Sequence, residues 1–218
     1  MKSDMQLQQD VMTELKWEPS VNATDILVVV QQGVVTLSGH VTNYAEKVAA
    51  EHATQRVGGV RAMTINIDVT LAGGDARADI DIARTAEETL RWVTYMPKDS
   101  VKVIVENGWI TLSGKLDWDY QRRNAVESVR HLCGVKGVSD LLAIKAKSQQ
   151  STEIRLDIEA ALERHYDADG QDISVTVRGP DVTLSGTVTS WWQLDSACTA
   201  AWNSPGVQHV ANQLIIAA

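Results

Sequence analysis

The tetrapeptide Thr-Leu-Ser-Gly occurs three times in this chain of 218 residues, at positions 36–39, 111–114 and 183–186. A Gly-Val pair follows each copy, with its glycine twenty residues after the glycine of the tetrapeptide. The sequences around the three copies align without a gap. A repeat of this period is typical of one structural unit used several times. We therefore predict three units, at residues 1–72, 76–148 and 149–218.

Each copy begins with apolar residues spaced four apart, which form one stripe along a helix. The stripes are Leu7, Val11 and Leu15; Ile82, Ala86 and Leu90; and Ile154, Ile158 and Leu162. A polar residue precedes each stripe at a position suited to capping the helix. We expect Asp4, Asp79 and Ser151 to be these caps.

A β-hairpin is predicted next, because β-branched residues alternate with other residues on both sides of a turn sequence. The turns are Gln32-Gly33, Asn107-Gly108 and Gly179-Pro180-Asp181. In the first strands, the residues expected to face the core are Ile26, Val28 and Val30; Val101, Val103 and Val105; and Ile173, Val175 and Val177. The second strands carry the tetrapeptide and should bury Val35 and Leu37, Ile110 and Leu112, and Val182 and Leu184.

A second helix follows in each copy, at about 43–57, 118–132 and 190–203, and its inner stripe consists of small residues. The Gly-Val pair ends this helix, and a third strand closes the unit. A right-handed crossover places the third strand parallel to the second. The sequence thus predicts an α+β fold of three tandem α-β-β-α-β units, each a three-stranded mixed sheet with two helices on one face.

This pattern resembles the BON domain family (bacterial OsmY and nodulation), and most closely its soluble, OsmY-like members with three BON units. The resemblance rests on Gly33 and Gly108 in the hairpins, the Thr-Leu-Ser-Gly runs, and the Gly-Val-x-x-Val turns at 134–138 and 206–210. The first copy departs from that turn at Met63, and the third has Pro180 at the hairpin glycine. The resemblance implies a phospholipid-binding or protein-interaction module of osmotic and envelope stress, without catalytic residues.

The formal net charge is −8, but it is unevenly distributed. The stretch through Asp75 carries −4, residues 76–149 carry +2, and the rest carries −6. A nucleic-acid binder is usually basic overall, so we predict no nucleic-acid partner. The N-terminal residues lack the apolar core of a signal peptide, and no stretch is long enough to span a membrane. The sequence as written predicts a cytoplasmic location, in solution or peripheral to the inner membrane.

No constellation of reactive residues accompanies the repeat. The five histidines share no spacing, and Ser38, Ser113 and Ser185 lack the surroundings of a nucleophilic serine. Cys133 and Cys198 occupy different places in their repeats, so we expect two buried thiols and no disulfide. We predict no enzymatic activity, no metal site and no cofactor.

Aromatic and basic residues gather at two places in the middle unit, which is the only one with a net positive charge. Such mixtures suit the interface of a membrane, where rings and charges occupy different depths. In lipid-binding relatives the first helix of one BON unit contacts the bilayer, and this resemblance also points to the first cluster. The candidate lipid-binding residues are Trp92, Tyr95, Met96 and Lys98 in the first cluster, and Trp118, Arg122 and Arg123 in the second.

The alternative for these aromatic residues is structural packing. Trp17 in the first copy matches Trp92, and an aromatic residue recurs early in each second helix. Recurrent aromatic residues of this kind favour packing against the edge of the sheet, and this alternative stays open at the level of sequence.

The open face of each sheet, opposite the helices, forms a second candidate surface. It is polar in the third unit, but the first two carry exposed apolar residues, namely Leu27, Val29 and Val34, and Ile104 and Trp109. Apolar patches usually mark an interface. We expect these faces to pack on each other within the chain or to bind a homo-oligomer or a partner protein. The sequence thus predicts a non-catalytic adaptor that acts by protein–protein contact, with binding to anionic phospholipid as the alternative.

Overall fold

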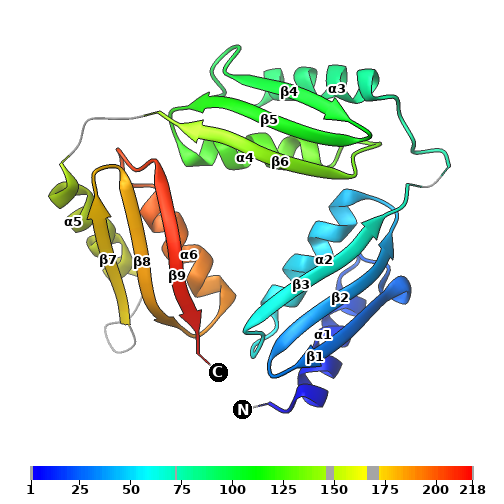
Figure 1. Cartoon of the computed structure of the whole chain (residues 1–218), viewed down its shortest axis with the longest axis horizontal. Helices are drawn as coiled ribbons and strands as arrows, with labels where there is room; N and C mark the ends of the chain where they lie inside the picture. The colour runs from blue at the N-terminus through cyan, green and yellow to red at the C-terminus, as the bar shows by residue number, and fades with distance from the viewer. Residues whose placement is uncertain (1, 72, 146–149, 166–171, 218) are drawn as a thin grey trace. The chain divides into compact units, whose positions relative to one another are not determined.

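The computed structural model describes residues 2–71, 73–145, 150–165 and 172–217 and contains the three repeats, each of which is described by itself (Figure 1). The first repeat consists of α1 (Asp4–Trp17), the short 3-10 helix η1 (Ala23–Asp25), β1 (Ile26–Gln31), β2 (Val34–Val41), α2 (Tyr44–Arg56) and β3 (Ala62–Val69). The second consists of α3 (Asp79–Trp92), β4 (Val101–Glu106), β5 (Trp109–Leu116), α4 (Asp119–Arg130) and β6 (Gly137–Ile144). The third consists of α5 (Ser151–His165), β7 (Asp172–Arg178), β8 (Asp181–Val188), α6 (Trp191–Trp202) and β9 (His209–Ile216).

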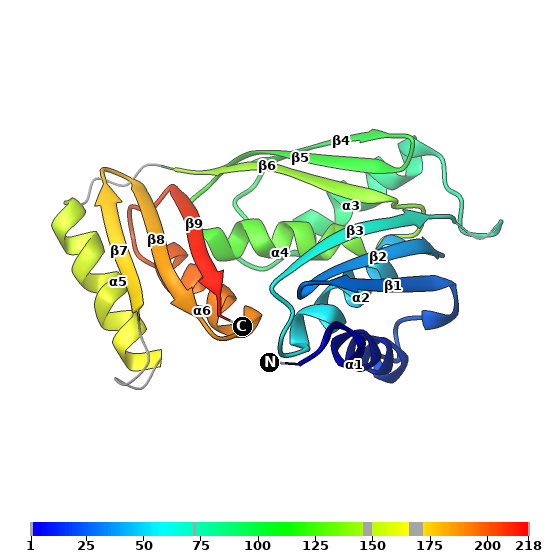
Figure 2. The same cartoon turned by 60° about the horizontal axis from the view of Figure 1, so that its bottom comes forward.

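The predicted α-β-β-α-β unit and its mixed three-stranded sheet are confirmed in all three repeats. The strand that carries the tetrapeptide is central in each sheet, and the first and third strands form the edges (Figures 1 and 2). In the first repeat, Leu37 of β2 pairs with Val28 of the antiparallel β1 and with Ile65 of the parallel β3. The third repeat has the same arrangement.

The core of each repeat lies between its sheet and its two helices. The apolar stripes of α1, α3 and α5 are buried as predicted, and so are the inner residues of the central strands. Ala50, Ala125 and Ala197 in the second helices are fully buried. Alanine at these positions allows the helix backbone to lie close to the sheet.

The predicted helix caps are wrong, and the residues concerned have another role. The cap of α1 is Ser3, in a reciprocal capping box with Gln6, while Ala78 precedes α3 without a side-chain cap. Asp4 is the first helical residue, and its carboxylate accepts hydrogen bonds from the backbone N–H groups of the hairpin turn.

These bonds recur in each repeat. Asp4 accepts from Gln32 at 2.8 Å and Gly33 at 3.1 Å, and Asp79 accepts from Asn107 at 2.7 Å and Gly108 at 2.9 Å. The hydroxyl of Ser151, the first residue of α5, accepts from Gly179 at 3.1 Å. Since tight hairpin turns leave backbone donors exposed, this side chain ties the start of the first helix to the hairpin.

The glycine of the tetrapeptide recurs because the backbone of another segment approaches it closely. Gly39 and Gly114 have φ angles of 133° and 145°. A Cβ atom would lie 2.0 Å from the carbonyl oxygen of Asp25 or Ser100, respectively. Glycine is therefore required where the second strand passes the start of the first.

A polar residue near the start of each second helix, buried in the first two repeats and half-buried in the third, was not predicted. Glu46 accepts hydrogen bonds from the backbone N–H groups of Asn22, at 2.8 Å, and Thr42, at 3.0 Å. Gln121 and Gln193 accept at the same place in the other repeats. The side chain at this position holds the junction between the second strand and the second helix. The recurrence of Glu or Gln at the aligned positions of the three copies is the sequence signal that could have predicted this role.

Candidate functional site

The first aromatic cluster lies at what we call the loop end of the second repeat, residues Arg91–Ser100. Helix α3 ends at Trp92 because the chain turns to extended backbone at Val93. Two tight turns follow, in which Met96 donates to the carbonyl of Val93 and Ser100 to that of Pro97. Tyr95 adopts a φ of 65° within the first of these turns. This compact path directs both rings outward, so that Trp92 is 88% and Tyr95 77% exposed.

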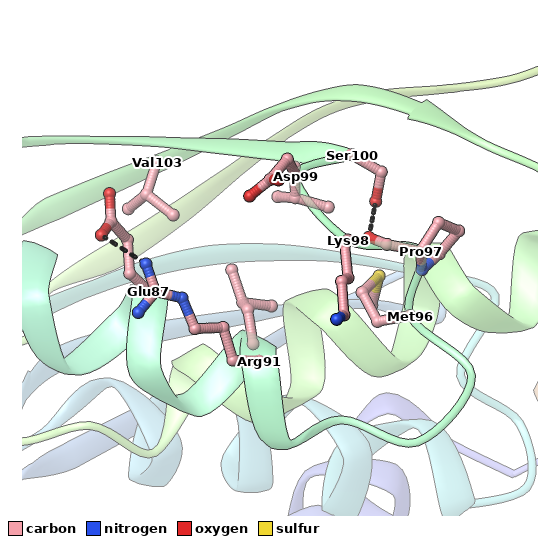
Figure 3. Close-up of a pocket in the computed structure, with 10 residues that line it drawn as sticks. Glu87, Arg91, Met96, Pro97, Lys98, Asp99, Ser100 and Val103 are labelled. Carbon is pink, nitrogen blue, oxygen red and sulfur yellow. Dashed lines mark hydrogen bonds and ion pairs between the residues drawn. The ribbon is translucent and has the colours of Figure 1, made fainter.

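A cavity of about 330 Å³ opens beside the loop end (Figure 3). It is bounded by the last turns of α3, the loop and the start of β4, and its lining includes Leu90, Met96 and Val103. Arg91 and Lys98 bring positive charge to it, Glu87 and Asp99 bring negative charge, and Arg91 lies 3.9 Å from the carboxylate of Glu87. Exposed ion pairs of this kind contribute little stability. The loop end therefore presents basic groups next to exposed rings.

The second predicted cluster is integrated into the fold of its helix. Trp118 is half-buried and directly precedes α4. Arg122 donates from Nε to the buried carboxylate of Asp119 at 2.8 Å, and Arg123 is exposed. A charge that neutralises a buried carboxylate is costly to withdraw, so Arg122 is a poor candidate for binding a ligand.

The packing alternative is wrong for the tryptophans that end the first helices. Trp17 is 81% exposed, and Trp92 is even more so. Packing describes the second helices better, because Tyr44, Trp118 and Trp191 are half-buried. The exposed tryptophans therefore need an explanation outside the core.

The predicted apolar residues of the open faces are exposed on the first two sheets. Leu27, Val29 and Val34 stand on the first, and Ile104 and Trp109 on the second. Trp109 lies across Gly137, where a Cβ would come within 2.4 Å of its ring, and its Nε1 donates to Ser139 at 2.8 Å. Burial of these faces against each other or a partner stays a prediction.

The two thiols differ in their surroundings. Cys133 is exposed, so its predicted burial is wrong. Cys198 is half-buried, and burial, with a smaller effect of the Asp195 charge, raises its pKa to about 11. Among the described residues, no group of histidine, cysteine and acidic side chains is arranged to hold a metal ion.

Comparison with known proteins identifies the repeat. The BON domain family matches residues 3–70, 78–146 and 150–218. This chain belongs to the BON domain family. BON domains are not an enzyme family, and here they account for nearly the whole chain. Within the described part of this BON protein, no helix has the length and apolar character needed to cross a membrane.

The BON protein is similar to Osmotically-inducible protein Y of Escherichia coli (strain K12), with 32% identity over 130 residues. That match covers 58% of this chain and 65% of the relative, less than two thirds of its length.

Two solved structures of CdsD, a structural protein of the type III secretion system of Chlamydia trachomatis, are 15% and 14% identical to this chain. They cover 97% and 100% of it, and the alignments span 92% and 100% of those chains. The TM-scores are 0.29 and 0.28, so the likeness says nothing further about this protein.

Proposed function

We propose that this protein acts without catalysis, by attaching to anionic phospholipid surfaces through the loop end of its second repeat. The observation that carries the proposal is the exposure of Trp92 and Tyr95 on one short loop. Exposing two large rings to water is unfavourable, and the interfacial layer of a membrane accommodates such rings.

The charges around the rings favour an anionic surface. Arg91 and Lys98 outnumber the one acidic residue, Asp99, on the segment that holds Trp92 and Tyr95, within the only repeat of net positive charge. A basic side chain near an anionic bilayer gains about 1 kcal/mol of binding free energy. Rings and basic groups on one loop therefore supply the two contributions that reversible surface binding combines.

Similarity to Osmotically-inducible protein Y supports a role in osmotic stress. Attachment to a membrane would place the chain where osmotic stress acts. Together with the interfacial chemistry of the loop end, this favours a stress protein of the membrane surface over one that acts only in solution.

Co-sedimentation with vesicles tests this function. The purified chain should pellet with vesicles that contain phosphatidylglycerol and remain in solution with pure phosphatidylcholine. Raising the salt concentration to about 0.5 M should weaken the binding, because salt screens exposed charges. Equal and negligible pelleting with both vesicle types at low salt would exclude the proposal.

The apolar open faces favour a second candidate function, that of an adaptor that binds a protein. Leu27, Val29 and Val34 form a patch on the first sheet, whereas the third repeat has Ser174, Thr176 and Asp181 at the corresponding places. A partner recovered with the wild type from osmotically stressed cells should be lost from Leu27→Asp/Val29→Asp and retained by Ser174→Asp/Thr176→Asp. Retention by both double variants would exclude this surface.

The absence of catalysis is tested separately. Purified protein should hydrolyse esters, phosphates and peptides no faster than a variant in which exposed serines and histidines are replaced. A reproducible excess for the wild type would overturn this part of the proposal.

A further inference from the structure

Strand β4 lies at an edge of the second sheet and has an unpaired side (Figures 1 and 2). A two-residue turn joins it to β5, so the closing pair Glu106 and Trp109 is a hydrogen-bonded pair. Such pairs alternate along an antiparallel ladder. Lys102 and Ile104 thus bond to β5, while three residues direct their backbone N–H and C=O groups away from the sheet: Val101, Val103 and Val105.

In the first repeat, a side chain occupies one backbone acceptor of the same edge. Gln8 of α1 donates from Nε2 to the carbonyl of Val28 on the edge strand β1 at 2.9 Å. The equivalent residues in the second repeat are Ala83 and Val103, and alanine has no such donor. Across the described residues, no side chain bonds to the edge groups of β4.

Space is available beside this open edge. The cavity near the loop end lies between the last turns of α3 and the start of β4, where it is lined by Val101 and Val103 (Figure 3). Unpaired strand edges are ready templates for another strand, and natural proteins usually block them. Gln8 occupies one acceptor of the first edge, whereas the corresponding acceptor of the second, at Val103, has no such bond in the described part of the chain, so the second edge is the more available of the two.

The sequence of β4 complements itself when it is reversed. In Lys102-Val103-Ile104-Val105-Glu106, opposite charges stand at equal distances from the central isoleucine. If two copies of β4 paired antiparallel with Ile104 at the centre, the backbone groups of Val103 in each copy would hydrogen-bond with those of Val105 in the other. It would also place each lysine opposite a glutamate, which stabilises paired strands. Lys102 and Glu106 are both exposed, and neither forms an ion pair in the part of the chain that the structure describes.

We propose that β4 pairs with β4 of a second copy of this chain, so that one sheet continues across a two-fold axis. The pairing would bury Ile104, which is 62% exposed, against its own counterpart. The equivalent edge strands β1 and β7 lack this complementarity, since Leu27 would face Gln31 in the first repeat and Ser174 would face Arg178 in the third. The occupant is therefore a second copy, joined through the second repeat.

Charge reversal tests the pairing with an internal control. Sedimentation velocity of the full chain at increasing concentration should show a dimer. Lys102→Glu and Glu106→Lys should each weaken it about tenfold or more, because like charges then face each other at two places. The double variant Lys102→Glu/Glu106→Lys should restore the dimer. A wild type that stays monomeric, or a double variant as weak as the single ones, would overturn the proposal and leave the edge to a foreign strand.

Disulfide trapping tests the register. Residues opposite each other in a non-hydrogen-bonded pair have Cα atoms about 4.5 Å apart, close enough for a disulfide. In a Cys133→Ser/Cys198→Ser background, Ile104→Cys should therefore oxidise to a covalent dimer. Val29→Cys, the equivalent change in the first repeat, should remain monomeric. Equal cross-linking of both variants would indicate random collision and refute the proposed register.

Introducing glutamine at position 83, the equivalent of Gln8, tests whether the missing side-chain bond leaves the edge of β4 available for pairing. Ala83→Gln should place a donor near the carbonyl of Val103, as Gln8 does at Val28, and should weaken the dimer. Circular dichroism checks that this variant remains folded, because Ala83 is half-buried. A folded Ala83→Gln protein with unchanged dimer affinity would count against pairing through this edge.

Discussion

The first and second repeats end their first helices with the same residue and differ in the charged residues around it. Trp17 and Trp92 occupy equivalent positions, and both are exposed. Near Trp17, Glu14 and Glu18 bind Arg56 at 2.9 and 2.8 Å. The second repeat has Thr89, Val93 and His131 at those three positions, and it adds Lys98 in the following loop.

The tryptophan thus recurs at the end of the first helix in both repeats, while the residues around it differ and determine what kind of surface it can contact. In the first repeat, Glu14 and Glu18 next to the ring would repel an anionic surface and pair with Arg56, while Lys16 precedes the ring. In the second, a further ring (Tyr95) and Lys98 are added, together with Asp99. An exposed tryptophan alone is thus insufficient to define a site, and the second ring and Lys98, which align with Ser20 and Ala23, distinguish the second loop end.

The largest effect is expected from removing the rings of the second loop end. Trp92→Ala/Tyr95→Ala should lower partition onto phosphatidylglycerol vesicles roughly fiftyfold, because burying about 100 Å² of ring surface contributes ~2.5 kcal/mol. Trp17→Ala should change it less than about twofold on the same basis. Vesicle co-sedimentation measures both. A larger loss from Trp17→Ala would move the membrane contact to the first repeat.

The open faces of the second and third sheets should differ in their contribution to stability. Trp109→Ser removes a ring that covers Gly137 and a hydrogen bond to Ser139, and should cost about 1–2 kcal/mol of unfolding free energy. Asp181→Ser, at the equivalent position in the third repeat, should cost less. Urea denaturation followed by circular dichroism measures both. Equal costs would mean that the Trp109 ring contributes no stabilising contact.

A single charge should make the second loop end resemble the first. Val93→Glu places a carboxylate where Glu18 stands and should weaken binding to anionic vesicles about fivefold, because one charge near the surface is worth about 1 kcal/mol. The difference should disappear at high salt, where charges are screened. The matched change Glu18→Val should leave binding unchanged, since that end makes no contact. Salt-independent weakening by Val93→Glu would indicate a structural effect instead.

The smallest effect concerns the acidic side of the first loop end. The hydrogen bond from Arg56, with a smaller one from Ser20, lowers the pKa of Glu18. A carboxyl group with a lowered folded pKa stabilises the fold above its unfolded pKa of about 4.5 and ceases to do so as pH falls through the folded pKa. Wild type should therefore melt slightly above Arg56→Gln at pH 7.

That difference should shrink as the pH falls below 4. Thermal denaturation at several pH values measures it, and Lys98→Gln serves as the control because it lies outside this ion pair. A difference between wild type and Arg56→Gln that stayed constant down to pH 2.5 would show that the Glu18 interaction does not stabilise the first loop end.

The repeat and its elements could be predicted from the sequence because helix stripes and strand alternation are local patterns. Leu7, Val11 and Leu15, for example, share one face of any helix that contains them, and alternate residues share one face of any strand. Three aligned copies of the same pattern then made the fold class and the family resemblance clear.

The tertiary structure alone decided which recurrent residues pack and which face solvent. Asp4 precedes a helix and is therefore a plausible cap, yet its carboxylate binds a turn 28 residues away. Trp17 and Trp92 recur as core residues do, yet the turns after each helix leave them exposed. Gln8 bonds to the edge of the first sheet, whereas Ala83, at the same position, has no side-chain donor. Each outcome depends on the approach of segments distant in sequence, which spacing along the chain does not encode.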